Sequence, residues 1–491
     1  MAILERVRKR LRDFLEIDTE KNKTIHIKQA LDFFANASKN LIWYRGESRE
    51  LSELYENIEA PSEMFWKAVS SRGLEIRKIH TGIPKLVVKT LVNILLHDYN
   101  GADVAEPALY DVWVEIAKEN KFDSDVLKKA FKSTMIVGDG AFKISYDGKI
   151  SADNPIVEFI SGENVEFKIE RGRIVETIFP TKYEHGNRKY IFRERYGYGY
   201  IRYELTTADD KPVPLDSIPQ TEWITSEGVE FAGDVMLAVP VILGASEMYE
   251  GRGESLYQGK TDAFDSLDEA WSQWMDALRA GRSKTYIPDN LLPRDPDTGA
   301  ILKPNSFDDR FIATAQNVSE NGKDEISIIQ PNIPHESYLS TYITALDLAL
   351  QGLISPSTLG IDVKKLDNAE AQREKEKTTL YTRGTLVDLF SAVIPEVIKA
   401  AVVAHQNIHE SAIQLPTATV NFGEYANPSF ESQIETISKG RAGSAVMSIE
   451  AGVEELYGDS KTEEWKAEEV RRIKNEQGIV EMDEPAVGVV V

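Results

Sequence analysis

The sequence feature that most constrains this fold is one long helical pattern over residues 368–405. Apolar residues recur there at three- and four-residue spacing, through Leu386, Phe390 and Val397. Asn368 suits the N-cap, because its side-chain oxygen can accept a hydrogen bond from an amide of the first turn. At about 1.5 Å per residue, such a helix spans roughly 55–60 Å. A helix of this length indicates an architectural component rather than the wall of an enzyme active site.

A second helix is predicted over residues 261–280, before a polar insert. Its large apolar side chains form one stripe, and its acidic side chains are expected to lie outside that stripe. The stripe consists of Phe264, Leu267, Trp271, Trp274, Met275 and Leu278, and the acidic residues are Asp262, Asp265, Asp268 and Asp276. The insert that follows is rich in proline and in Asp-Gly or Asn-Gly turns, which predict two or three short strands. Residues 337–353 then return as a helix, so the insert is a projecting β-rich lobe.

The rest of the chain divides by the period of its apolar residues. Residues 1–135 carry mainly the helical period, and this includes the segment SEMFWKAVSS at 62–71. From Gly138 the period changes to two, which predicts strands and an antiparallel hairpin turning at Arg171-Gly172. A further strand is expected in LPTATVNFG, and short helices follow in an acidic C-terminal tail. The fold class is therefore α+β.

Composition limits the classes of function. At 491 residues the chain should hold two to four domains, and the absence of cysteine excludes disulfides, thiolate metal sites and cysteine nucleophiles. The formal net charge of −23 argues against a protein that coats nucleic acid through a basic face. It is compatible with a passage through which DNA slides without adsorbing. No apolar run is long enough for a membrane span, so no membrane partner is expected.

The strongest enzymatic motif is Gly253-Glu-Ser-Leu-Tyr-Gln-Gly259-Lys260-Thr261. A phosphate-binding P-loop needs four residues between its glycines and a strand leading into the loop, whereas this segment has five and no such strand. The alternative is a connector in which Thr261 caps the next helix. His405 and His409 would share one helix face, as in some zinc sites, but no third ligand is obvious. We therefore expect no catalytic residue, no cofactor and no metal site.

Residues 354–367 form a predicted loop that contains two adjacent lysines, Lys364 and Lys365. Pro356 and Gly360 interrupt the helical pattern there. One interpretation is a solvated lysine pair on a linker. The other is a loop whose lysines contact a phosphate backbone.

Three segments together resemble portal proteins of long-tailed bacteriophages. They are GRGESLYQGKTDAFDSLDEAWSQWMDALRAGRSKTYIP (251–288), ISPSTLGIDVKKLDNAEAQREKEKTTLYTRGTL (354–386) and, for the wing region, GDGAFKISYD (138–147). The likeness covers essentially the whole chain, and 368–386 is its most specific part. It implies a homo-oligomeric ring, typically of about twelve copies, at one capsid vertex. Double-stranded DNA would be packaged, retained and ejected through the channel, without sequence specificity.

The resemblance also implies a division of the chain into the parts of an elongated portal subunit. Lys364 and Lys365 would be the DNA-contacting residues of the tunnel loop. The parts are a mixed α/β wing (1–253), a stem helix (254–281), a β-rich clip (282–334), a second stem helix (335–353), the tunnel loop (354–367), a long channel-to-wing helix (368–408), a wing return strand (409–430), and a helical crown with an acidic tail (431–491).

The partners implied are the terminase large subunit, which docks at the clip, the head-completion adaptor that replaces it, and the major capsid and scaffold proteins. The protein would be assembled in the host cytoplasm and reside in the virion. Two alternatives stay open from the sequence: a non-portal head–tail adaptor or minor capsid protein, and a nucleotide-dependent motor subunit that uses Lys260.

Overall fold

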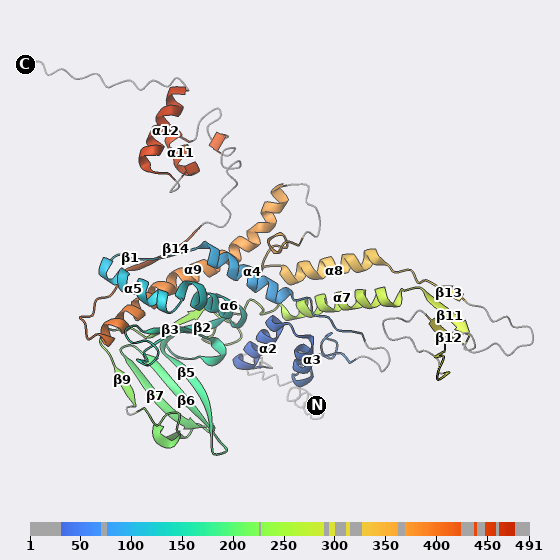
Figure 1. The fold of residues 1–491 in the computed structure, drawn as a ribbon, viewed down its shortest axis with the longest axis horizontal. Coiled ribbons are helices and arrows are strands. Elements are labelled where there is room, and N and C mark those ends of the chain that lie inside the picture. The colour runs from blue at the N-terminus through green and yellow to red at the C-terminus, as the bar shows by residue number, and fades with distance from the viewer. Residues whose placement is uncertain are drawn as a thin grey trace, which may run out of the picture. The chain divides into compact units, whose positions relative to one another are not determined.

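The computed structural model describes residues 31–69, 76–224, 227–288, 294–299, 311–314, 327–361, 369–423, 437–438, 447–457 and 461–476. The chain divides into two compact units, Met1–Phe422 and Gly423–Val491, each described here by itself. The first unit contains both helices and sheets, which confirms the predicted α+β class (Figure 1).

The helices of the first unit account for both long helical patterns of the sequence. They are α2 (Phe33–Arg45), α3 (Ser48–Asn57), α4 (Ile83–Asp98), α5 (Pro107–Glu119), α6 (Leu127–Val137), α7 (Thr261–Ala280), α8 (His335–Leu350) and α9 (Ala369–Ile408). Helix α9 runs for 40 residues and continues through Pro395. The prediction of one very long helix is therefore confirmed, while Asn368 lies outside the described residues.

Within the described residues, four sheets accompany these helices. The largest is antiparallel, with strand order β4-β5-β6-β7-β8 and with β9 also paired to β7; a second has the order β10-β2-β3. Their strands are β2 (Asp139–Ser145), β3 (Ile156–Ser161), β4 (Glu166–Glu170), β5 (Arg173–His185), β6 (Arg188–Gly197), β7 (Tyr200–Thr207), β8 (Pro212–Val213), β9 (Gly228–Glu230) and β10 (Ala238–Ile242). The predicted hairpin at Arg171-Gly172 is confirmed, because Glu170 pairs with Arg173 across the turn.

Two smaller sheets join distant segments. Strand β1 (Tyr99–Val104) pairs antiparallel with β14 (Ala418–Phe422), and Tyr99 packs against Phe422 with 5.6 Å between ring centroids. The insert between α7 and α8 contains β11 (Lys284–Pro288), β12 (Phe311–Thr314) and β13 (Ser327–Ile329), in the order β12-β11-β13. The strands expected in the insert and in LPTATVNFG are therefore present.

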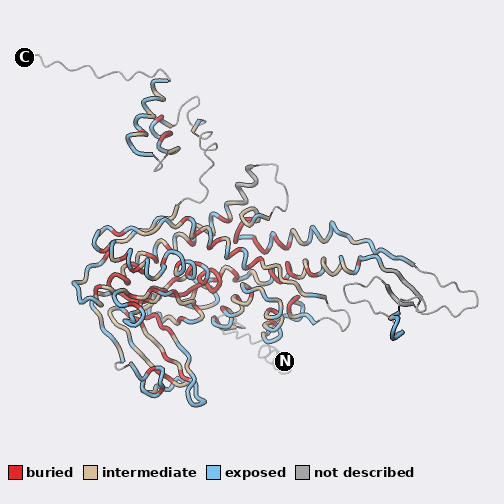
Figure 2. The backbone as a smooth tube through the Cα atoms, in the orientation of Figure 1, coloured by how far each residue is buried: buried red, intermediate tan, exposed pale blue. Residues whose placement is uncertain are grey.

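The core of the first unit is built around the C-terminal half of α9. Phe390 is fully buried and meets Phe131 of α6 edge to face, with ring centroids 4.5 Å apart. Ile394, Val397 and Ile398 are also buried, in the same cluster as residues of α4, α5, β2 and β10. Figure 2 shows this buried interior as a continuous red region between α9 and the sheets. The apolar pattern that predicted α9 is therefore the face that it buries.

One buried ion pair ties β2 to the segment before α7. The guanidinium of Arg252 donates to both carboxylate oxygens of Asp139, at 2.9 Å each, and to the carbonyl oxygens of Gly162 and Val165. Its Cζ atom lies 3.7 Å from the ring centroid of Phe33. Burial raises the pKa of Asp139 and lowers the pKa of Arg252, while their mutual attraction opposes both shifts. The pair therefore depends on both members being present.

Among the described residues of the second unit are two short helices, of the kind that the sequence predicts for this tail. Helices α11 (Ile449–Tyr457) and α12 (Glu463–Glu476) contact each other, and Lys466 forms ion pairs with Glu454, at 2.9 Å, and with Glu463. Tyr457 packs edge to face against Trp465, with ring centroids 4.9 Å apart.

At two places the secondary structure differs from the one that the sequence predicts. The segment 62–71 was expected to be helical, but its described part, 62–69, consists of turns and irregular backbone. Strand β1 was not anticipated, because its sequence YNGADV has no clear alternation of apolar residues. In both places long-range partners decide the conformation: β14 completes β1, and α7 holds the backbone of residues 65–66.

Candidate functional site

Helices α7 and α8 lie side by side and lead from the core to the small sheet β11–β13 (Figure 1). The buried residues of α8 are Ala345, Leu346, Ala349 and Leu350, all in its C-terminal half. Toward the small sheet both helices become progressively exposed (Figure 2). The outer part of this pair is therefore a surface that the described chain does not cover.

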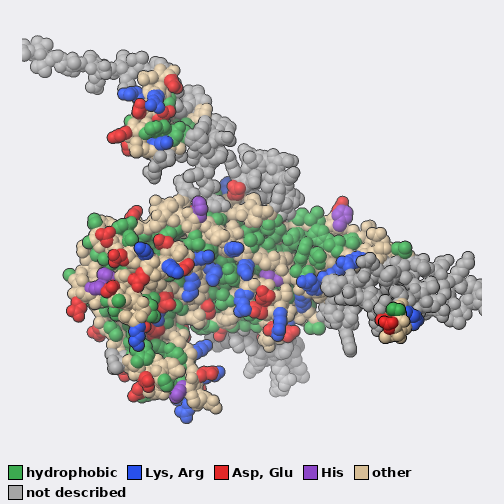
Figure 3. Space-filling view, viewed as in Figure 1, with side chains coloured by type: hydrophobic (Ala, Val, Ile, Leu, Met, Phe, Trp, Pro, Cys, Tyr) green, Lys and Arg blue, Asp and Glu red, His purple; other side chains and the backbone are tan. Residues whose placement is uncertain are grey.

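The exposed surface of α8 carries very little charge. Of its 16 residues only Glu336 and Asp347 are acidic, and none is lysine or arginine. Leu339 is 44% exposed and Leu348 is 53% exposed. Figure 3 shows hydrophobic side chains gathered over this helix. An uncovered helix of this composition is typical of a protein–protein contact, because solvent-facing helix surfaces are normally polar.

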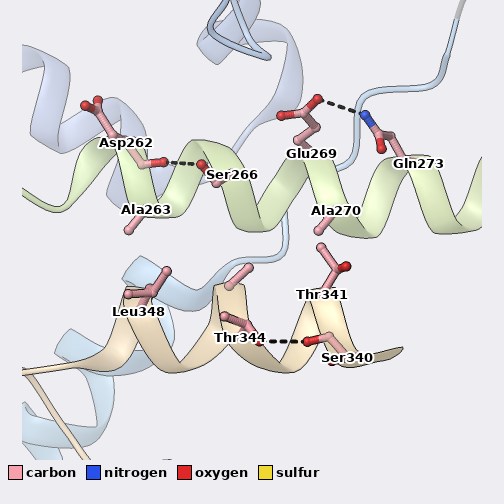
Figure 4. Close-up of a pocket in the computed structure, with 11 residues that line it drawn as sticks. Asp262, Ala263, Ser266, Glu269, Ala270, Gln273, Ser340, Thr341, Thr344 and Leu348 are labelled. Atoms are coloured by element: carbon pink, nitrogen blue, oxygen red, sulfur yellow. Dashed lines mark hydrogen bonds between the residues drawn. The ribbon is translucent and has the colours of Figure 1, made fainter. Parts of the chain in front are cut away.

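A groove of about 680 Å³ runs between α7 and α8 (Figure 4). Most of its lining side chains are small. They are Ala263, Ser266 and Ala270 of α7, and Ser340, Thr341, Thr344 and Ala345 of α8, with Leu348 at one end. Asp262, Glu269 and Gln273 project from the edge of α7 that is turned away from α8. The groove is thus shallow and neutral at its floor and acidic along one rim.

Several polar side chains of the groove already have partners within their own helices. The hydroxyl of Ser266 donates to the carbonyl of Asp262, and that of Thr344 donates to the carbonyl of Ser340, at 2.9 Å in both cases. Gln273 donates to Glu269 at 2.8 Å. Because these groups need no external hydrogen bond, an apolar side chain can enter the groove without leaving them unsatisfied.

Aromatic side chains hold the two helices together beyond the groove. Trp274 stacks on Tyr338 with ring centroids 6.4 Å apart, and Trp271 meets Tyr342 at 5.4 Å. Such pairs contribute about 0.5–1.5 kcal/mol beyond the burial of their area. These contacts with α8 explain why the apolar stripe of α7 continues through Trp271 and Trp274, beyond the buried core.

The other side of α7 bears a buried polar ladder that fixes the helix to residues 65–81. The carboxylate of Asp265 accepts from the amides of Phe65 and Trp66, at 2.8 and 3.1 Å. Asp268 is fully buried and accepts four hydrogen bonds, which anchor three residues. The donors to Asp268 are Trp66 Nε1 (3.1 Å), His80 Nδ1 (2.7 Å), and the amide and hydroxyl of Thr81 (2.8 Å each).

This ladder corrects a sequence prediction. Asp265 and Asp268 were expected outside the buried stripe, yet their carboxylates are buried beside Phe264 and Leu267. Burial raises the pKa of Asp265, and the two backbone amides that it accepts from oppose that rise. The sequence alone could not indicate this, because the partner amides lie about two hundred positions earlier in the chain.

The predicted DNA-contacting residues, Lys364 and Lys365, lie outside the described residues. The described start of their loop is attached to α9. The amide of Ser355 donates to Thr379 Oγ1 at 3.0 Å, and the hydroxyls of Thr358 and Thr379 are 2.9 Å apart. The role of the two lysines stays a prediction.

Lys260 occupies the N-cap position of α7, and Thr261 is the first helical residue. The expectation that Thr261 caps the helix is therefore wrong. The Lys260 ammonium donates to the carbonyl of Leu348 at 3.4 Å.

A Cβ at Gly253 would lie 2.0 Å from the carbonyl oxygen of Gly138, so this glycine permits two backbone segments to pack closely.

His405 and His409 do lie together, with ring centroids 4.3 Å apart. The Nε2 atom of His409 is 2.9 Å from the carbonyl oxygen of Asp153, so it carries the hydrogen and donates. Burial, and then the neighbouring His409, lower the pKa of His405, while Glu115 and Asp153 act in the opposite direction. Within the described ranges, no group of three or more acidic or histidine side chains is arranged to hold a metal ion.

The histidine pair should make stability depend on pH. A histidine whose pKa is lowered on folding contributes stability above its unfolded pKa of about 6.5, and this contribution is lost as the pH falls through that value toward the folded pKa. His405→Gln should therefore show a smaller loss of unfolding free energy between about pH 8 and pH 5 than the wild type. The effect should be small, because the ring is partly exposed. His185→Gln, at an exposed position on β5, is the control. Parallel pH curves for His405→Gln and the wild type would contradict this assignment.

None of the described helices combines the length and the apolarity needed to cross a membrane. The sequence analysis predicts this helix but does not identify the outer face of α8 as a candidate contact surface. The sequence does contain a signal for this surface. A helix with only two acidic residues and no lysine or arginine exposes a nearly uncharged surface wherever it is not buried.

Comparison with known proteins gives a limited result. No family model and no curated protein sequence matches the chain. Among solved structures, one chain from the "Neck of native GTA particle computed with C12 symmetry" is 13% identical, with a TM-score of 0.39. The alignment covers 77% of this chain and 90% of that one. A chain from the "Neck of empty GTA particle computed with C6 symmetry" is 12% identical, with a TM-score of 0.40, over 75% of this chain and 89% of that one.

Proposed function

We propose that this chain is the portal subunit of a tailed-phage-like particle. Copies of it would form a closed ring at one capsid vertex, and the ring would conduct double-stranded DNA and serve as a docking platform for the packaging motor and the head–tail adaptor. The observation that carries the proposal is the exposed, nearly uncharged face of α8 beside the neutral groove between α7 and α8. The resemblance of residues 251–288 and 354–386 to phage portal proteins supports it independently.

A ring accounts for this surface by simple geometry. A head-to-tail interface joins two different faces of the same subunit, and it closes when the rotation between copies completes a circle. The exposed face of α8 offers Leu339, and the groove, with Leu348 at one end, offers small side chains, among which Ser266 and Thr344 already have their hydroxyls hydrogen-bonded. Fully burying an exposed leucine side chain contributes about 1.5–3 kcal/mol, and because Leu339 is only 44% exposed, its burial on the neighbouring copy would contribute roughly half of that.

The overall charge suits a conduit. A chain with a net charge of −23 would repel the DNA backbone from most of its surface, so DNA could move without adsorbing. Contacts from a few lysines in each subunit would be salt-sensitive and independent of sequence. The proposal includes Lys364 and Lys365 in this role, and it assigns the chain no catalytic residue and no cofactor.

Substituting both exposed leucines of α8 tests the proposal. Leu339→Glu combined with Leu348→Glu should abolish ring formation while leaving the helical content of the subunit unchanged, because neither side chain belongs to the core. Mass photometry and negative-stain imaging give the oligomeric state, and circular dichroism reports the fold. Leu415→Glu is a matched control, since Leu415 is 50% exposed and lies outside the α7–α8 pair.

Two outcomes would reject the proposal, and one would reject only the assignment of α8 to the ring interface. Wild-type protein that forms no ring with a central hole under any condition would favour a non-portal adaptor or a minor capsid component. Rings that form equally well from the double variant would remove α8 from the interface. Hydrolysis of ATP by the purified chain would favour a motor subunit, in which Lys260 would have to leave the Leu348 carbonyl.

A further inference from the structure

A group of lysines on α4 and α6 forms a basic face that the proposed function does not use. The group comprises Lys85 and Lys89 of α4, and Lys128, Lys129 and Lys132 of α6, all exposed. The two helices contact each other. Figure 3 shows Lys and Arg side chains gathered over this region. The chain carries a formal net charge of −23, so a face of positive charge has the opposite sign to the chain as a whole.

These lysines are not neutralised by the described part of the chain. None of the five forms an ion pair there, and the contact recorded for Lys85 is with the ring of Tyr44, at 6.0 Å. Of the carboxylates next to these two helices in the sequence, Asp125 is exposed just before α6, and two others have partners of their own. Asp98 binds Arg383 at 2.7 Å, and Asp123 hydrogen-bonds the hydroxyl of Tyr99. The five lysines, none of which forms an ion pair within the described residues, therefore give this face a net positive charge.

The packing of the two helices explains why the lysines share a surface. Helix α4 buries Val87, Val88, Leu91 and Val92, which leaves residues 85 and 89 on its exposed side. Helix α6 is buried from residue 133 onward, and its exposed residues lie in the first turns. Within each helix, residues four apart have Cβ atoms about 5–6 Å from each other. The result is two short rows of ammonium groups on adjacent helices.

The residue type favours a phosphate polymer over a protein partner. Protein–protein interfaces are enriched in arginine and depleted of lysine, and no arginine occurs between Lys78 and Glu170. Lysine acts toward phosphate as a compact point charge that needs no fixed approach angle. The only large apolar side chain exposed on α4 is Leu86, at 37%, so the face lacks the apolar centre of a protein interface.

We propose that this lysine face, comprising Lys85, Lys89, Lys128, Lys129 and Lys132, binds the phosphate backbone of double-stranded DNA. It would be a second DNA-binding surface, separate from the tunnel loop. The contact is electrostatic, so it is independent of base sequence and weakens steeply with salt. It does not require the ring, so it can hold or fail independently of the portal function.

The test compares two variants that change the net charge equally. One combines Lys128→Glu, Lys129→Glu and Lys132→Glu on α6. The control combines Lys182→Glu, Lys189→Glu and Lys211→Glu, which replace exposed lysines of the large sheet or its loops. Binding to a fluorescent duplex of random sequence is measured by anisotropy over a range of salt concentrations, at matched oligomeric state.

The α6 variant should bind about tenfold or more weakly at low salt, and the slope of log affinity against log salt should fall by about 3, one for each lost phosphate contact. The control should retain most of the wild-type affinity and slope. Equal losses in both variants would show that net charge alone matters, and absence of wild-type binding at about 50 mM salt would remove the proposal. DNA binding that survives in the α6 variant, with a changed oligomer mass, would assign the face to an acidic protein surface instead.

Discussion

Asp268→Ala is expected to lower the free energy of unfolding of the first unit by about 3–5 kcal/mol. The carboxylate is fully buried and accepts hydrogen bonds from Trp66, His80 and Thr81. Its removal would leave several buried donors without an acceptor, and each of them costs about 1–3 kcal/mol when it cannot reach water. Urea unfolding followed by tryptophan fluorescence measures the change.

Two further substitutions separate the hydrogen bonds of Asp268 from a general effect of altering α7. Asp268→Asn keeps the shape but turns one acceptor into a donor, so about half of the loss is expected. Asp262→Ala removes an exposed carboxylate from the first turn of the same helix, and should cost no more than about 1 kcal/mol. A loss below that value for Asp268→Ala would mean that the ladder does not fix α7 to residues 65–81.

Arg252→Met is expected to destabilise the first unit by about 3–5 kcal/mol at neutral pH, because it leaves a buried carboxylate without its partner. The side chain of Asp139 is fully buried and that of Arg252 is 10% exposed. Two carbonyl oxygens, of Gly162 and Val165, would lose their donor as well. Arg173→Met, at an exposed position on β5, should stay within about 0.5 kcal/mol of the wild type.

The pH dependence of the Arg252→Met variant identifies the cause. Burial already raises the pKa of Asp139, and loss of the guanidinium should raise that pKa further. A carboxyl group whose pKa is raised on folding favours the protonated folded state, so the deficit should be largest at neutral pH and shrink as the pH falls. Adding Asp139→Asn should recover part of the lost stability. A deficit that does not change with pH, and that Asp139→Asn does not relieve, would attribute the effect to lost packing against Phe33.

The sequence predicts the parts of this fold whose conformation depends on local pattern. Helices α7 and α9 follow from the spacing of their apolar residues, and the hairpin at Arg171-Gly172 follows from its turn residues. The predictions fail where residues far away in the sequence determine the local conformation or burial. Residues 62–69 are turns because α7 binds their backbone, and Asp268 is buried because donors from residues 66, 80 and 81 surround it.

The candidate site divides in the same way. The apolar character of α8 can be identified from the sequence, but whether Leu339 faces the core or solvent depends on what packs beside it, and no periodicity gives that. The lysines of α4 and α6 are far apart in the chain, and they become one surface only when the helices pack. Lys364 and Lys365, which the sequence did single out, lie in the loop between α8 and α9, outside the described residues.

The pairing of β1 with β14 has a consequence for synthesis. Ala102 lies opposite Val420. Strand β1 is synthesised early, and it cannot pair until β14, near the end of the unit, has been synthesised. Contacts between such distant positions slow folding, since the intervening chain must be ordered before they can form. Until β14 arrives, the edge of β1 remains open to other chains. Nascent copies emerging close together could exchange this strand, so the interval before Phe422 is made is when the growing chain is most vulnerable to mispairing.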